Sequence, residues 1–296
     1  MSIQPAYVGY RVANTIARLL PEAAVLPMSR ATGLVASKVM RGRAEMVARH
    51  QERVQGPLAP ERLAAAVGNV FTSYAHYWIE SFRLPGTSPE ELDAKFTHTG
   101  WEHVRDAIDA DQGVVLAMPH LGAWEWAGFW TTAVQNIKVT TVVEAIEPPE
   151  LAAWFTGLRE AFGFEIIPLG PDAGSAAMAA LRSARILTLL CDRDVSGGGI
   201  EVEFFGERTT LPAGPATIAL RSGAALVPAT VFFDGMHHRG LALPPIDTSR
   251  HGKLREDIKR VTQALADNLE VLIREAPEQW HLLQPNWPSD HEAVEA

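Results

Sequence analysis

The sequence predicts an α/β protein with a largely parallel central sheet, helices on both faces of the sheet and a helical N-terminal part. From about residue 113, short runs rich in Val, Ile, Leu or Phe alternate with stretches suited to helices. Continuous apolar strands separated by helices are typical of parallel strands covered on both faces. Before that point, apolar residues recur at helical spacing. With 47% hydrophobic residues, the 296-residue chain can form a sizeable core.

The first hundred residues are expected to be helical. Apolar residues at helical spacing predict one helix from Ala6 to Leu20 and a second from Pro60 to Phe82. Pro21, Pro27, Gly56 and Pro57 punctuate this segment, and LPGTSPEEL marks a loop followed by a new helix.

The second part is expected to alternate strands and helices. The predicted strands are 113–118, 140–146, 164–169, 186–191 and 224–233; the predicted helices are 124–134, 149–162, 173–184, 212–223 and 253–275. No linker is long enough to require a second independent domain, so we expect one domain over 1–296. It comprises a mainly helical part (1–105), an α/β core (106–250) and a C-terminal helix and tail (251–296).

Composition restricts the classes of function and the location. A net charge of -9 and a pI near 5.6 argue against nucleic acid as the main ligand, because phosphate binding needs clustered Lys and Arg. No apolar run is long enough for a transmembrane helix, and the N-terminus has no signal-peptide pattern. The single cysteine, Cys191, agrees with a reducing compartment. We therefore expect a cytoplasmic protein.

The stretch MPHLGAWEWAG places His120 and Glu125 five positions apart, between a predicted strand and a predicted helix. Open α/β sheets bind their ligands at the carboxyl ends of strands. If His120 lies in the turn and Glu125 in the helix, the carboxylate could orient one ring nitrogen while the other removes a proton from a hydroxyl. The amides at the helix start could stabilise an oxyanion. The alternative is a buried histidine bonded to a backbone carbonyl.

A histidine followed four residues later by an acidic residue, just after an apolar strand, resembles the signature of the glycerolipid and lipid A acyltransferases. The block from Cys191 to Pro228, with its FFG and GPA segments, is similar to the second large block of the lipid A branch. Within that branch, SYAHYWIESFRLPG, GLREAFGFEIIPL, VTQALADN and WHLLQPNW look like phosphatidylinositol mannoside acyltransferases. This resemblance covers nearly the whole chain. The departures are Glu125, where Asp is common in relatives, and Asp192, where close relatives carry Glu.

The resemblance implies that His120 is the general base and that Glu125 supports it, with Asp192 as a further catalytic residue at the end of a neighbouring strand. We also expect acyl-CoA binding by His120 and four other residues, of which the resemblance points to Arg159, and substrate binding by the two residues that follow Asp192. The four are Arg159, Gly198, Phe205 and Arg221; the two are Arg193 and Asp194. The alternatives are a surface ion-pair cluster for 192–194, solvated helix surface for Arg159 and Arg221, and plain core for Phe205.

The expected activity is transfer of a fatty acyl chain, palmitoyl by preference, from acyl-CoA to a mannose hydroxyl of a phosphatidylinositol mannoside. No cofactor, metal or nucleic acid is expected. Two alternatives stay open: a lysophospholipid or lipid A-like acceptor, and a non-catalytic lipid-binding protein. Peripheral attachment to the cytoplasmic face of the inner membrane is expected through an apolar stripe on the first helix beside basic groups, although the stripe could also pack on the core. The stripe is Val8, Val12, Ile16 and Leu19, and the basic groups are Arg11 and Arg18.

Overall fold

The computed structural model describes residues 5–144, 149–182, 185–195 and 197–292. Seven strands form one sheet in the order β1-β9-β8-β2-β5-β3-β4. All neighbours pair in parallel except β8 and β9. The strands are β1 (Phe96–Thr99), β2 (Val114–Met118), β3 (Val139–Val143), β4 (Glu165–Pro168), β5 (Ile186–Leu190), β8 (Ala225–Asp234) and β9 (His237–Ala242). The predicted mainly parallel α/β sheet is confirmed.

All five predicted strands form, and the two strands at one side of the sheet, the edge strand β1 and its neighbour β9, were missed. Continuous apolar runs such as VVLAM identify the central strands, because both faces of each are covered. The missed strands, FTHT in β1 and HHRGLA in β9, are polar or contain glycine and so lack that signal. A separate antiparallel hairpin, β6 (Ile200–Phe204) and β7 (Glu207–Leu211), was also missed. Residues 145–146 of one predicted strand and 183–184 of one predicted helix lie outside the described part of the chain.

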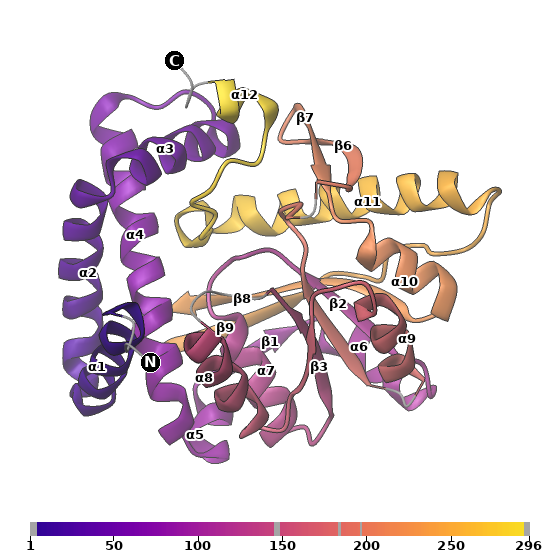
Figure 1. Ribbon diagram of the computed structural model, residues 1–296, viewed down its shortest axis with the longest axis horizontal. Coiled ribbons are helices and arrows are strands. Elements are labelled where there is room, and N and C mark those ends of the chain that lie inside the picture. Colours follow the sequence, from indigo (N-terminus) through magenta and orange to yellow (C-terminus); the bar gives the residue numbers. More distant parts are fainter. Residues whose placement is uncertain (1–4, 145–148, 183–184, 196, 293–296) are drawn as a thin grey trace.

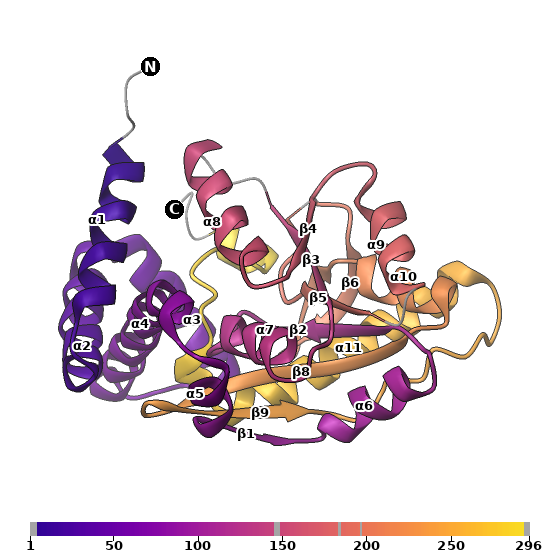
Figure 2. The same cartoon turned by 90° about the horizontal axis from the view of Figure 1, so that it is seen from below.

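Helices cover both faces of the sheet (Figures 1 and 2). On one face, α9 (Ala173–Leu181), α10 (Gly214–Ser222) and α11 (Leu254–Glu275) bury Val115, Ala117 and Leu187. On the other face, α5 (Pro89–Ala94), α6 (Trp101–Asp109) and α7 (Trp124–Ala133) bury Val114 and Leu116. Successive residues of β2 thus point to opposite faces, as strand geometry requires.

The first four helices lie together beside the sheet (Figures 1 and 2). They are α1 (Pro5–Leu19), α2 (Glu22–Val39), α3 (Arg41–Gln55) and α4 (Pro60–Arg83). Pro27 lies inside α2, so its expected role as a helix boundary was wrong. Gly33 allows α2 to approach α4 closely, since a Cβ there would lie 2.5 Å from the Thr72 Cα. Helix α8 (Pro149–Glu160) packs against α1 and β4.

After α11 the C-terminal segment passes the carboxyl ends of β8, β2 and β5, where it contacts Phe233, His120 and Asp192. It consists of a short 3₁₀ turn, η2 (Pro277–Gln279), an irregular stretch and the short helix α12 (Pro288–Glu292), while a second turn, η1 (Leu84–Gly86), follows α4. Among the described residues, no helix combines the length and apolar character needed to cross a bilayer.

Candidate active site

His120 and Asp192 lie side by side because of strand register. Strands β2 and β5 pair in parallel with Met118 opposite Leu190, so the residues two positions beyond each strand are neighbours as well. After His120 the chain turns sharply at Gly122, whose φ is +64°. A Cβ at that position would lie 2.0 Å from the Val231 carbonyl oxygen, so the turn that presents His120 requires glycine.

Asp192 makes two hydrogen bonds with His120. The His120 Nδ1 lies 2.6 Å from Asp192 Oδ1, and the His120 backbone N–H donates to Oδ2 at 3.0 Å. The Trp280 indole N–H also donates to Oδ2, at 2.8 Å. The carboxylate is fully buried, whereas the His120 side chain remains 29% exposed. Asp192 is therefore held rigidly, whereas the His120 ring remains accessible to a ligand.

The electrostatics of Asp192 determine which tautomer of His120 is present. Burial raises the pKa of Asp192, but the positive charge of His120 and the hydrogen bonds from His120 and Trp280 outweigh burial and bring it below its ordinary value. An ionised carboxylate only accepts hydrogen bonds, so His120 Nδ1 carries the proton. Nε2 is then the basic nitrogen available to a substrate.

Glu125 has different partners from those the sequence suggested. Its carboxylate accepts hydrogen bonds from Arg159, with Nε at 3.1 Å from Oε1, and from the Tyr77 hydroxyl at 3.4 Å. Among the described residues, no hydrogen bond joins Glu125 to His120. The predicted direct contact fails because Glu125 lies in the first turn of α7, between α4 and α8, whereas the strand register gives Nδ1 of His120 to Asp192. Burial lowers the pKa of Arg159, but the Glu125 charge outweighs burial and raises it above its ordinary value.

The backbone amides next to His120 are largely engaged in fixing the turn. The amide of Leu121 donates to the Pro119 carbonyl, Gly122 to Gln279 and Ala123 to Val231. These three amides are therefore occupied and not free for the oxyanion stabilisation that was expected at the helix start.

A cavity of about 600 Å³ opens beside His120. Its apolar walls come from the sheet and from α7, α8 and α9, and include Leu116, Met118, Val139, Ala127, Phe155 and Ala177. Tyr74, Tyr77 and Trp124 form an aromatic group in the lining near His120, with the Tyr77 and Trp124 rings stacked at 4.1 Å. Glu125, Arg159, Arg193 and Asp194 also line it.

Arg193 and Asp194 line this cavity but already have protein partners. Arg193 Nη2 lies 3.4 Å from Glu144 Oε2. The Asp194 carboxylate accepts hydrogen bonds from the amides of Gly197 and Gly199, at 3.1 and 2.7 Å, and so organises the loop before β6.

Three residues expected to bind acyl-CoA are not in the cavity lining. Gly198 lies in the exposed loop and Arg221 is exposed in the last turn of α10. Phe205 is 7% exposed in the hairpin turn and packs against Trp280 and Arg274, so the structure places it in the core, outside the cavity lining. Both phenylalanines of the FFG segment are therefore core residues. The sequence alone does not distinguish an apolar pair in the core from one that lines an acyl-binding slot.

His281 and Trp280 reach the site without having been assigned roles from sequence. The His281 backbone N–H donates to the His120 carbonyl oxygen at 2.7 Å, and its Nε2 lies 2.9 Å from the Ser73 hydroxyl. Burial, followed by the positive charge of His120, lowers the pKa of His281 to about 3, so it is neutral. The clustering of tryptophan and histidine in WHLLQPNW was a sequence signal for a functional segment. Its contacts could not be predicted, because His120 and Asp192 are distant from it in sequence.

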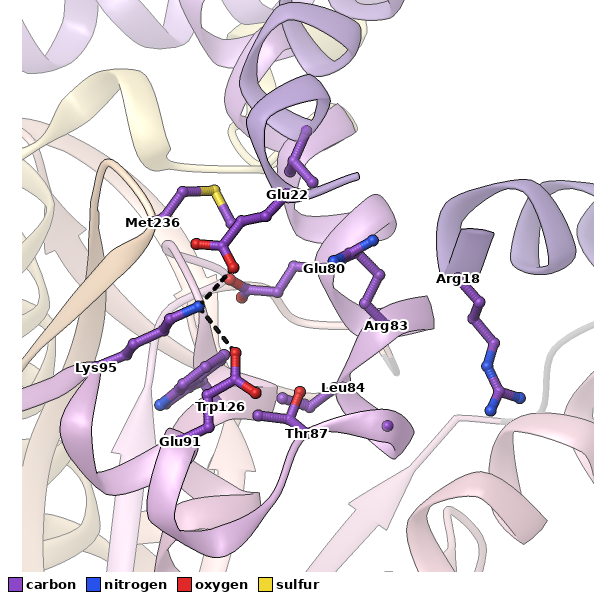
Figure 3. Close-up of a pocket in the computed structure, with 12 residues that line it drawn as sticks. Arg18, Glu22, Glu80, Arg83, Leu84, Thr87, Glu91, Lys95, Trp126 and Met236 are labelled. Carbon is purple, nitrogen blue, oxygen red and sulfur yellow. Dashed lines mark hydrogen bonds and ion pairs between the residues drawn. The ribbon is translucent and has the colours of Figure 1, made fainter. Parts of the chain in front are cut away.

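A smaller cavity, of about 230 Å³, lies between α2, α4 and α5 (Figure 3). Most of its charged side chains pair with one another or with the surrounding protein. Lys95 bridges Glu22 at 3.0 Å and Glu91 at 2.8 Å. Glu80 accepts from His238 at 2.7 Å. These pairs join the helical part to the sheet, and the cavity shares no lining residue with the one beside His120.

The chain is similar in sequence to known proteins over most of its length. The family model described as "Bacterial lipid A biosynthesis acyltransferase" matches residues 6–289. The chain is 36% identical over 286 residues to a protein of Mycolicibacterium smegmatis named phosphatidylinositol mannoside acyltransferase, covering 95% of this chain and 91% of the relative. It is 37% identical over 223 residues to a Mycobacterium tuberculosis protein of the same name, covering 74% of this chain and 69% of the relative.

Proposed function

The chain belongs to the bacterial lipid A biosynthesis acyltransferase family and is an acyltransferase, and from that premise we propose the following reaction: it transfers a fatty acyl chain from acyl-CoA to a mannose hydroxyl of a phosphatidylinositol mannoside. The observation that carries the proposal is His120, oriented by a buried carboxylate at the wall of a largely apolar cavity. The names of the relatives support the choice of acceptor.

In the proposed mechanism, Nε2 of His120 takes the proton from the acceptor hydroxyl as its oxygen attacks the thioester carbonyl carbon. The C–S bond of the tetrahedral intermediate then breaks, and the CoA sulfur receives the proton from His120. Asp192 holds the tautomer and stabilises the imidazolium. Glu125 supports the site indirectly, by holding Arg159 at the cavity wall. The reaction needs no cofactor and no acyl-enzyme.

The donor chain is proposed to lie between α7 and the sheet, along Leu116, Met118, Val139 and Ala127. A volume of about 600 Å³ lies within the range of ~300–1,000 Å³ typical of small-molecule sites. Each buried methylene contributes ~0.8 kcal/mol, so kcat/KM should rise with chain length until the slot is filled, with palmitoyl proposed as the preferred chain. An Ala127→Leu variant should shift the preference toward shorter chains, and an unchanged preference would place the chain elsewhere.

Peripheral membrane attachment is proposed through α1 and α2. Large apolar side chains are exposed at Val12, Ile16 and Leu19 of α1, and at Leu26, Met28, Leu34, Val35 and Val39 of α2. The side chain of Val8 lies outside the described part. Residues 5–43 carry six Lys or Arg and one Glu, although the whole chain has a charge of -9. An apolar surface beside basic groups favours an anionic lipid interface, here the cytoplasmic face of the inner membrane.

Flotation with liposomes tests this attachment. An Ile16→Gln/Leu19→Gln variant should lose binding to anionic vesicles, because both side chains are exposed, at 56% and 79%. Val271→Gln is the matched control, since Val271 is 55% exposed on α11, away from these helices. Equal binding by all three proteins would contradict the proposal.

The activity is tested by incubating the purified protein with palmitoyl-CoA and a panel of mannolipids, lysophospholipids and lipid A-like acceptors, and reading the products by mass spectrometry. The proposal predicts an acylated phosphatidylinositol mannoside and free CoA, and none of this product with His120→Ala. Products on another acceptor alone would support one of the alternative acceptors. Full transfer by His120→Ala would contradict the role of the histidine.

A further inference from the structure

The segment from Pro277 to Glu292, here called the C-terminal strap, makes three hydrogen bonds to the His120–Asp192 pair. The Trp280 indole N–H donates to Asp192 Oδ2 at 2.8 Å, the His281 backbone N–H donates to the His120 carbonyl at 2.7 Å, and the Asn286 side-chain amide donates to the Asp192 carbonyl at 3.0 Å. Only the contact made by Trp280 reaches the carboxylate itself.

The far end of the strap is anchored on α3 by Asp290. This fully buried carboxylate accepts hydrogen bonds from His50 Nε2 at 3.2 Å and from Arg53 Nη2 at 3.1 Å. It also accepts from the backbone amides of Asn286 and Trp287, at 3.0 and 3.1 Å. The strap is thus fixed at a point remote from the reaction, which lets it hold Trp280 in one place.

The two carboxylate oxygens of Asp192 have different hydrogen-bond partners. Oδ1 faces His120 Nδ1, while Oδ2 accepts from the His120 backbone and from Trp280. Asp192 is fully buried, so water cannot replace a missing donor on Oδ2. Without the indole N–H, the carboxylate would keep one donor on Oδ2 and would hold the ring in one orientation less rigidly. Removal of that donor would also concentrate negative charge toward His120.

We propose that Trp280 is a positioning residue of this acyltransferase: its indole N–H, delivered by the C-terminal strap, fixes the Asp192 carboxylate so that Oδ1 orients His120. This inference rests on the proposed function of His120 as general base. The alternative is that Trp280 only fills space, since it is 1% exposed and packs against His50 and Phe205.

A second tryptophan of the strap, Trp287, provides a matched control for substitutions of Trp280. Trp287 is fully buried as well, but its indole N–H donates to the Phe204 backbone carbonyl at 3.1 Å and not to Asp192. Trp280→Phe and Trp287→Phe therefore remove the same atoms from the same segment, and only the first removes a donor from the catalytic pair. Replacement of either tryptophan by β-(3-benzothienyl)alanine, in which sulfur replaces the N–H, keeps the ring size if the Phe variants fold poorly.

The experiment measures kcat, KM and the pH profile of acyl transfer for these proteins. Loss of the N–H at 280 should lower kcat about 10- to 100-fold with little change in KM, as expected for a hydrogen bond to a charged group. The acid limb of the profile should move to higher pH, because a less solvated carboxylate stabilises the imidazolium. The changes at 287 should leave this limb in place. An unmoved limb at 280, or an equal loss at 287, would overturn the proposal.

A second readout separates this inference from the proposed function. The Nδ1 proton of His120, hydrogen-bonded to Asp192, is observable by NMR without substrate. It should shift on removal of the N–H at 280 and not at 287. If the unmodified protein shows this pattern but transfers no acyl group, the proposed function fails and the positioning role stands. If transfer occurs and the signal is indifferent to position 280, the positioning role fails.

Discussion

Asp192 and Glu125 are both buried carboxylates at the candidate site, yet their surroundings differ. Asp192 is hydrogen-bonded to the ring and the backbone amide of His120 and to the indole of Trp280. Glu125 accepts hydrogen bonds from the guanidinium of Arg159 in α8 and from the hydroxyl of Tyr77 in α4. The hydrogen-bond partner of the His120 ring is therefore Asp192, its neighbour across the strands, and not Glu125, five positions along the chain. The two carboxylates should therefore respond differently to the same chemical change.

The largest expected difference is between Asp192→Asn and Glu125→Gln. Asn at 192 can present an amide to Nδ1 and favour the wrong tautomer, so kcat should fall about 10³- to 10⁴-fold. Gln at 125 leaves the His120 contacts intact, and kcat should fall about 10-fold through the altered Arg159. Steady-state kinetics with palmitoyl-CoA checks this. The reverse ranking would make Glu125 the partner of His120 during the reaction.

Next in size is the effect of Arg159→Met on stability. It leaves Glu125 buried without its cation, which should cost about 3 kcal/mol in the free energy of unfolding. Equilibrium urea unfolding measures it. The double variant Glu125→Gln/Arg159→Met should recover much of the loss, since no unpaired charge remains. Additive losses in the double variant would mean that the pair does not act as a unit.

A third prediction concerns how the free energy of unfolding depends on pH through His281, the neutral histidine next to the His120–Asp192 pair. Its pKa is about 3 when folded and 6.5 when free, so between these values the unfolded chain binds a proton that the folded chain excludes. This contribution is complete above pH 6.5 and is lost as the pH falls, by about 2 kcal/mol between pH 7 and pH 5. Urea unfolding should therefore show a smaller pH 7-to-5 loss in His281→Phe than in the unmodified protein. Equal losses would indicate that His281 is protonated in the folded state.

The smallest effect is expected at Arg221, which lies exposed and outside the cavity. Arg221→Ala should change the unfolding free energy by less than about 0.5 kcal/mol and leave KM for palmitoyl-CoA unchanged. A rise in KM would instead support donor binding by Arg221, as predicted from the sequence. Arg159→Met, measured alongside, should raise KM if its guanidinium contacts the donor.

The parts of the site that the sequence could predict are those set by strand ends. The runs VVLAM and ILTLL identify two buried strands, and placing His120 and Asp192 after them requires only that these strands be parallel neighbours. The partner of Glu125 could not be predicted, because Arg159 and Tyr77 come from helices whose packing no local pattern specifies. Phe205 shows the same limit, since an apolar residue in a core and one lining an acyl slot have the same sequence signal.

The central claim concerns the proton on His120, and NMR of the ¹⁵N-labelled protein measures it directly, with His120→Ala assigning the signals. The account predicts that the neutral ring carries its proton on Nδ1, that this proton is strongly deshielded by Asp192, and that the signal is altered in Asp192→Asn but retained in Glu125→Gln. A proton on Nε2, or a signal that changes only with Glu125→Gln, would contradict it.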